Sequence, residues 1–262
     1  MFPDEDLSVI VDFILVQLKS RNDRHFRLNL LTLIRTAIQN NRQLSSLAFD
    51  KLIQHVLPLK EISPSVSFAK QLICFSKLCS LFIWTDLNLE TQKRLVEAHS
   101  ILCTFFSRSK SKSLYDLNYK FLKQTLISCN LDGYFEILSG MTSNLQTCIL
   151  CDNVIRFTIE FKISTFFNAH KTYILDSFVK GIVMMKTKIC NTVESFCFAN
   201  TLSQLDFNDF KTTLFPTIQK AVLRSAETSL VLISFLLELL NFDLSDLSQG
   251  LILVSDTLIR VF

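Results

Sequence analysis

The stretch "TLFPTIQKAVLRSAETSLVL", residues 213–232, decides the fold class. Its apolar residues recur at helical spacing before and after Ser225, a pattern typical of two consecutive amphipathic helices. Pro216 lies inside the first run and predicts a kink there, because proline donates no backbone hydrogen bond. Ser225 is a candidate N-cap for a second helix over 226–240. The stretch therefore predicts a helix pair whose first member is bent.

The same pattern continues along the chain of 262 residues. Glycine and proline occur only four times each, which disfavours turn-rich β architectures. The spacing of 37 residues from Phe210 to Leu247 is close to the period of two-helix repeats. We therefore expect an all-α fold, a HEAT-like right-handed α-solenoid of antiparallel helix pairs. Helices are expected over 7–18, 24–39, 44–56, from Ser63 onward, 89–106, 114–126, 133–138, 147–161, 173–185, 193–202 and 210–224.

Three regions are expected from this pattern. Residues 1–106 are N-terminal helical repeats, and "SRSKSKS" (107–113) is a basic linker. Residues 114–262 are further HEAT-like repeats. The last stretch, "LILVSDTLIRVF" (251–262), remains apolar without a polar capping repeat, so the array is expected to be truncated at its C-terminal end.

Composition argues for a soluble cytoplasmic protein. The mean hydropathy is +0.33, but the longest uncharged run (137–151) contains seven polar or glycine positions and is shorter than a membrane span. The acidic start "MFPDEDLS" is unlike a signal peptide. The eight cysteines lie mostly in apolar stretches, and we expect them to be small core residues.

Catalytic motifs are absent from the sequence. The four glycines are isolated, so no phosphate loop can be written, and the four histidines are far apart. Cys148 and Cys151 form a C-x-x-C pair without further thiolate or imidazole ligands nearby, so no metal is expected there. The carboxylate pairs Asp4/Asp6 and Asp206/Asp209 are interpreted as loop charges or caps. No enzyme activity, cofactor or small-molecule substrate is expected.

Basic residues supply the candidate binding sites. One cluster is Arg21, Arg24 and Arg27; the others are Arg108, Lys110 and Lys112 in the linker, and Lys220 with Arg224 one helical turn apart. Such residues bind phosphates by releasing condensed counterions. Each cluster taken alone is also compatible with a solvated surface.

Three stretches resemble the N-terminal part of the general control translational activator family, which consists of giant HEAT-repeat proteins. They are "DFKTTLFPTIQKAVLRSAE" (209–227), "YILDSFVKGIVMMKTK" (173–188) and "DLSQGL" (246–251), and "QKRLVEAHSILCTFF" (92–106) is more weakly similar. Ala226 departs from the proline that relatives often have at this position.

The resemblance implies a non-catalytic scaffold that associates with ribosomes. It implies support for activation of the kinase for initiation factor two alpha during amino-acid starvation or ribosome stalling. That kinase and an ABC-type ATPase partner would be contacted through regions beyond this chain, leaving this segment a share in ribosome association. The alternatives are an unrelated α-solenoid adaptor of transport or chromatin type, and a helical enzyme domain.

Overall fold

The computed structural model describes residues 84–107, 112–185 and 198–222, and the single positions 9, 12, 13, 16, 29 and 255. Helices make up most of these residues and none of them is in a strand, so the predicted all-α class is confirmed for the described part. The predicted Ser225 cap, the helix over 226–240 and the apolar end at 251–262 lie outside the described ranges, apart from position 255. The HEAT-like stacking of helix pairs stays a prediction.

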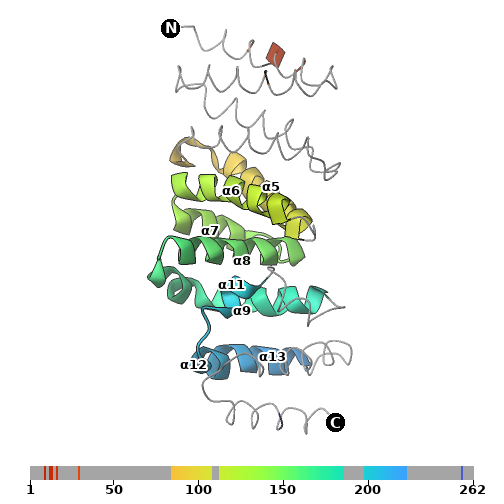
Figure 1. Cartoon of the computed structure of the whole chain (residues 1–262), viewed down its shortest axis with the longest axis vertical. Coiled ribbons are helices and arrows are strands. Elements are labelled where there is room, and N and C mark those ends of the chain that lie inside the picture. The colour runs from red at the N-terminus through yellow and green to blue at the C-terminus, as the bar shows by residue number, and fades with distance from the viewer. Residues whose placement is uncertain are drawn as a thin grey trace. The chain divides into compact units, whose positions relative to one another are not determined.

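The chain divides into two compact units, Met1–Gly140 and Met141–Phe262. In the first unit the 3₁₀ helix η2 (Trp84–Asp86) leads into α5 (Leu89–Ser107), α6 (Lys112–Ser128) and α7 (Leu131–Gly140). Helix α5 packs against both α6 and α7, and Figure 1 shows α5 and α6 side by side. These three helices match the predicted segments 89–106, 114–126 and 133–138 to within two residues at each end.

Side-chain caps fix where helices of the first unit begin. The Asn88 side-chain oxygen accepts a hydrogen bond of 2.8 Å from the backbone nitrogen of Thr91, as an N-cap residue does. Asn130 accepts similarly from the backbone of Asp132 ahead of α7. The buried side chains of Trp84, Phe121 and Tyr134 then fill the space between the helices.

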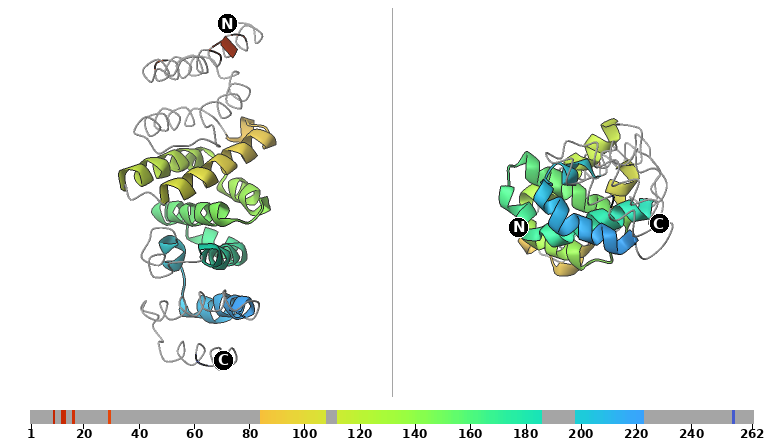
Figure 2. Two further views of the ribbon diagram at one scale, coloured as in Figure 1. Left: turned by 90° about the vertical axis from the view of Figure 1, so that its right-hand side faces the viewer. Right: turned by 90° about the horizontal axis from the view of Figure 1, so that it is seen from below.

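The second unit is built on the pair α8 (Leu145–Glu160) and α9 (Ser164–Met185). Asn144 and Thr147 form a capping box that starts α8. The two helices pack along their length, as Figures 1 and 2 show from two directions. Helix α9 begins at Ser164, earlier than the predicted start at residue 173. The residues around Phe166 and Phe167 are polar, so the sequence pattern there did not predict a helix, although both phenylalanines are buried.

Four short elements follow in the described part of the second unit. They are α11 (Ala199–Leu202), α12 (Phe207–Asp209), the π-helix η3 (Phe210–Leu214) and α13 (Phe215–Val222). Helix α11 packs on α8, while η3 and α13 pack on α9. No described helix is long and apolar enough to cross a membrane.

Candidate functional site

The helix from Phe207 to Val222 carries the candidate residue Lys220, and Pro216 sets its shape. Proline has no backbone N–H, so an α-helical bond to the carbonyl of Thr212 cannot form. The five residues before α13 adopt a π-helical turn instead, closed by the backbone nitrogen of Phe215 donating to the carbonyl of Phe210. The disturbance predicted at Pro216 therefore takes the form of a π turn that ends at Leu214, ahead of the proline.

This helix has one buried and one exposed side. Phe210, Leu214, Phe215 and Ile218 are buried, as the sequence predicted for its apolar arc. The exposed described side chains are Asn208, Lys211, Thr212 and Lys220. Thr213 and Thr217 are half-buried. The π turn has more residues per turn than an α-helix, which shifts the register of the two sides.

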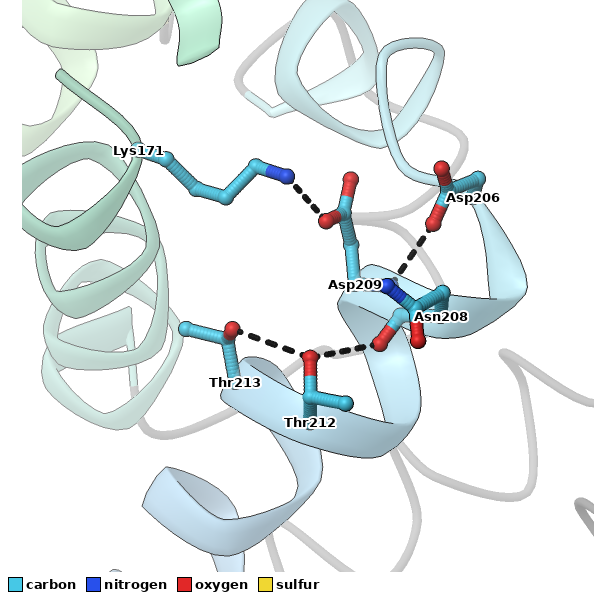
Figure 3. Close-up of polar contacts among 6 residues, drawn as sticks. All are labelled: Lys171, Asp206, Asn208, Asp209, Thr212 and Thr213. Carbon is cyan, nitrogen blue, oxygen red and sulfur yellow. Dashed lines mark hydrogen bonds and ion pairs between the residues drawn. The ribbon is translucent and has the colours of Figure 1, made fainter. Parts of the chain in front are cut away.

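A lysine of α9 holds the start of this helix in place. Lys171 forms an ion pair with Asp209, and the two side chains are 28% and 7% exposed (Figure 3). Asp206, one turn earlier, accepts a hydrogen bond of 2.7 Å from the backbone nitrogen of Asp209. Asp206 is thus an exposed cap, as predicted, whereas Asp209 is buried and neutralised. Since Asp209 is the only carboxylate in 207–222, the outer side of this helix carries no negative charge of its own.

The remaining candidate residues are placed only in part. Lys112 is the first residue of α6, and its side chain lies outside the described atoms. Arg108, Lys110, Arg224 and the cluster of Arg21, Arg24 and Arg27 all lie outside the described ranges. The binding role of all these residues stays a prediction.

Two lysines that the sequence analysis did not single out continue the basic stretch along α6. Lys120 is exposed and Lys123 is half-buried. Lys112, Asp116, Lys120 and Lys123 follow one another at intervals of four, four and three residues, which places them on one side of the helix. The sequence contains this spacing. It places the four residues on one side of a helix only if the helix begins at Lys112, which lies within the expected linker.

Asp152 is a buried carboxylate in the middle of α8 that the sequence analysis also missed. Its oxygens accept three hydrogen bonds from the start of α11: 2.8 Å from Asn200 Nδ2, 2.8 Å from Thr201 N and 2.7 Å from Thr201 Oγ1. Burial raises the pKa of Asp152 to about 7, although these donors act in the opposite direction. The contact fastens α11 onto α8 and leaves the carboxylate only 1% exposed, out of reach of a ligand.

His99 occupies a similar central place in the first unit. Its Nδ1 lies 2.9 Å from the Tyr134 hydroxyl, its Nε2 lies 3.4 Å from the Thr125 hydroxyl, and its ring packs on Phe121 at 4.5 Å between centroids. Burial lowers the pKa of His99 to about 3, so the imidazole is neutral at physiological pH. With no exposed surface, His99 serves packing and cannot meet a substrate in this conformation.

Three of the four cysteines in the described ranges are core residues, and the fourth, Cys129, is half-buried. Cys103, Cys148 and Cys151 are buried thiols, which confirms that interpretation for these three positions. Burial raises the pKa of both Cys148 and Cys151, which disfavours the thiolate that a metal requires. Within the described part, no three His, Cys, Asp or Glu side chains come together as a metal site would need.

Comparison with known proteins finds similarity to one family. Residues 171–260 match the family model described as "Stalled ribosome sensor GCN1 N-terminal". The chain is 29% identical over 122 residues to the human protein named "Stalled ribosome sensor GCN1", and 30% identical over 125 residues to the mouse protein of that name.

The matched stretch covers 47% of this chain but 4% of the human protein, and 46% of this chain but 5% of the mouse protein. No solved structure matches the chain. The resemblance found in 173–251 is thereby confirmed as similarity to an N-terminal segment of these long proteins.

Proposed function

We propose, on the premise that this chain carries an N-terminal segment of the GCN1 family, that it is a non-catalytic scaffold segment which associates with ribosomes. The observation that carries the proposal is the match of residues 171–260 to the family model, together with two relatives named as stalled ribosome sensors. The segment would work in the cytoplasm, where ribosomes translate. It would contribute a binding surface and no catalytic residue.

The proposal extends to a place in stress signalling. The scaffold supports activation of the kinase for initiation factor two alpha during amino-acid starvation or ribosome stalling. Contacts with that kinase and with an ABC-type ATPase partner are assigned to other regions of the longer protein. This segment helps to hold the longer protein on the ribosome.

Exposed cations supply the proposed contact. Lys220 stands exposed on α13, on a helix whose only carboxylate is paired with Lys171. Arg224 follows four residues later, and Arg108, Lys110 and Lys112 form the second group. Ribosomal surfaces are rich in phosphate, and each lysine or arginine that meets a phosphate releases a condensed counterion. The association is therefore expected to weaken as salt is raised.

Cosedimentation with purified ribosomes at low and moderate salt tests the proposal. Two variants reverse the candidate charges: Lys220→Glu with Arg224→Glu, and Arg108→Glu with Lys110→Glu and Lys112→Glu. Lys93→Glu with Lys162→Glu is a charge-matched control for the first, because both lysines are exposed and lie outside the candidate groups. Surface changes of this kind cost about 0.5 kcal/mol or less, so each variant should remain folded.

We expect the wild type and the control to sediment with ribosomes, and the variant at Lys220 and Arg224, the best candidates, to stay in the supernatant. Binding by both candidate variants at wild-type level would show that the assigned residues are wrong. A wild-type chain that never sediments with ribosomes would refute ribosome association by this segment.

A further inference from the structure

Helix α11 is held on α8 through one buried carboxylate. The helix spans only Ala199–Leu202, and Asp152 of α8 accepts hydrogen bonds of 2.7 to 2.8 Å from its residues Asn200 and Thr201. Asp152 is 1% exposed and Thr201 is 2% exposed. The docked helix therefore forms part of the wall that separates this carboxylate from water.

Among the described residues, no cation compensates the charge that Asp152 carries when it is ionised. Burial raises the pKa of Asp152, and the groups that act in the opposite direction are the uncharged donors of Asn200 and Thr201. Arg156, one turn later on α8, is not among them, and the adjacent Cys151 is a buried thiol whose pKa is raised by burial. Residues 199–202 of α11 have no charged side chain.

Helix α9, which also packs on α8, supplies no counter-charge to this carboxylate either. Its titratable residues are His170, Lys171, Tyr173, Asp176 and Lys180. Lys171 pairs with Asp209, and Lys180 pairs with Asp176 at 2.6 Å. The ionised form of Asp152 is thus destabilised while α11 is docked, because its hydrogen-bond partners are uncharged.

Protonation of Asp152 keeps the contact with α11 and removes the cost of a buried charge. A carboxylate loses favourable hydration when it leaves water, and uncharged donors replace only part of it. Burial accordingly raises the pKa of Asp152 from 3.8 to about 7. In the protonated acid, one oxygen can donate to the Thr201 hydroxyl while the other still accepts from Asn200.

We propose that Asp152 and α11 form a proton-linked latch, in which α11 docks firmly while Asp152 is protonated and opens more often when Asp152 is ionised. Opening gives the carboxyl group access to water, and its proton is released to the solvent. The docked carboxyl group has a pKa of about 7, whereas the pKa of an open one returns toward 3.8, so docking weakens as pH rises between these values. The weakening approaches about tenfold per pH unit, and a fall from pH 7 to pH 6 tightens docking by about fivefold.

The latch is bounded on both sides by contacts that do not involve Asp152. Before α11, Phe198 is buried so close to Gly181 of α9 that no Cβ atom would fit between them. After α11, the ion pair of Lys171 with Asp209 holds α12. We therefore expect opening to be confined to residues 199–205.

Hydrogen exchange of the 262-residue chain, followed by mass spectrometry at pH 5, 6, 7 and 8, tests the latch. The backbone N–H groups of Thr201, Leu202, Gln204 and Leu205 are hydrogen-bonded in the docked state, so their exchange reports opening. After correction for the intrinsic pH dependence of exchange, opening should increase by up to about tenfold between pH 5 and pH 6. Between pH 7 and pH 8 it should increase by less than about twofold, because Asp152 is then already ionised.

Two variants identify the group that titrates. Asp152→Asn cannot ionise, so opening of residues 199–205 should no longer depend on pH. His170→Gln is the control, because histidines as a class change charge between pH 5 and pH 8. This variant should keep the wild-type profile.

Three results would overturn the latch. Residues 199–205 that exchange no faster than α8 would show that α11 does not open by itself. A pH dependence that Asp152→Asn keeps, or that His170→Gln loses, would assign the titration to another group. If Asp152→Asn does not fold, as circular dichroism would show, the wild-type profile decides alone: opening that is constant or falls from pH 5 to pH 7 contradicts the latch.

Discussion

Each unit has a buried polar side chain that can titrate, His99 in the first and Asp152 in the second, and burial shifts their pKa values in opposite directions. In the first unit His99 contacts the hydroxyls of Tyr134 and Thr125 and packs on an aromatic ring, so burial favours its uncharged form. In the second unit Asp152 accepts hydrogen bonds from three donors at the start of α11, all of them uncharged. The imidazole is neutral far below physiological pH, whereas the pKa of Asp152 is raised to about 7.

The contrast teaches that a buried polar group is not by itself a functional site. Both groups are fully enclosed, and both join elements that are distant in sequence: α5 to α7 through His99, and α8 to α11 through Asp152. Their polar atoms take part in hydrogen bonds inside the units. We propose that binding depends instead on the exposed cations, such as Lys220.

The largest expected effect concerns Asp209, another buried carboxylate of the second unit, which pairs with Lys171. Lys171→Met should lower the free energy of unfolding by about 3 kcal/mol, because Asp209 remains buried without its partner. The value is near the low end for broken buried pairs, since the Lys171 side chain is 28% exposed. Denaturant unfolding followed by circular dichroism measures it. A loss below about 1 kcal/mol would show that this pair behaves as a surface pair.

Opposite pH dependence is expected for His99 and Asp152. The pKa of His99 falls from 6.5 to about 3 on folding, so between these values the unfolded chain binds more protons and stability rises with pH. The pKa of Asp152 rises from 3.8 to about 7, so the folded chain binds more protons between these values and stability falls as pH rises. Each slope approaches about 1.4 kcal/mol per pH unit at most.

Comparison of wild type with His99→Gln and Asp152→Asn at pH 4.5 and 6.5 isolates these two contributions. The advantage of wild type over His99→Gln should grow with pH, and its advantage over Asp152→Asn should shrink. Trp84, the only tryptophan in the chain, packs on Tyr134 and gives a fluorescence signal for the first unit. Slopes of the same sign in both comparisons would refute the contrast between the two centres.

A smaller effect on stability is expected from replacing one glycine in each unit, Gly181 in the second and Gly133 in the first. A Cβ atom at Gly181 would collide with the ring of Phe198, so Gly181→Ala should cost about 1–3 kcal/mol through overpacking. At Gly133 a Cβ would make only ordinary contacts of 3.8 Å with Asn130. Gly133→Ala in α7 should therefore be neutral or stabilise by up to about 1 kcal/mol. Thermal melting of the two variants compares them, and a stabilised Gly181→Ala would contradict the close approach of Phe198 to α9.

Helical periodicity was enough to predict the fold class and much of the packing. The apolar residues Phe210, Leu214, Phe215 and Ile218 repeat as one arc, and all four are buried. The form of the distortion at Pro216 could not be predicted, because kinks and π turns both accommodate a missing N–H. The choice depends on tertiary contacts of the segment with neighbouring helices, which the local sequence does not encode.

The candidate surface was predictable only in part for a similar reason. The helical spacing of the apolar residues in 210–218 predicts that Lys220 is exposed, as the structure shows. The continuation of the basic stretch to Lys120 depends on where α6 begins, and the "SRSKSKS" composition suggested a linker up to residue 113. The partners of Asp152 are 48 and 49 residues away in sequence, and no local pattern encodes a contact at that separation.

The central claim is that exposed cations bind the ribosome while the buried centres only hold the helices together. Ribosome cosedimentation and melting temperature, measured together for Lys220→Glu with Arg224→Glu and for Gly181→Ala, test it most directly. The account predicts that the charge-reversed chain melts like wild type but loses ribosome binding. It predicts that Gly181→Ala melts earlier but sediments with ribosomes as wild type does, at a temperature where it is folded. A folded Gly181→Ala chain that loses ribosome binding, beside a charge-reversed chain that keeps it, would contradict the account.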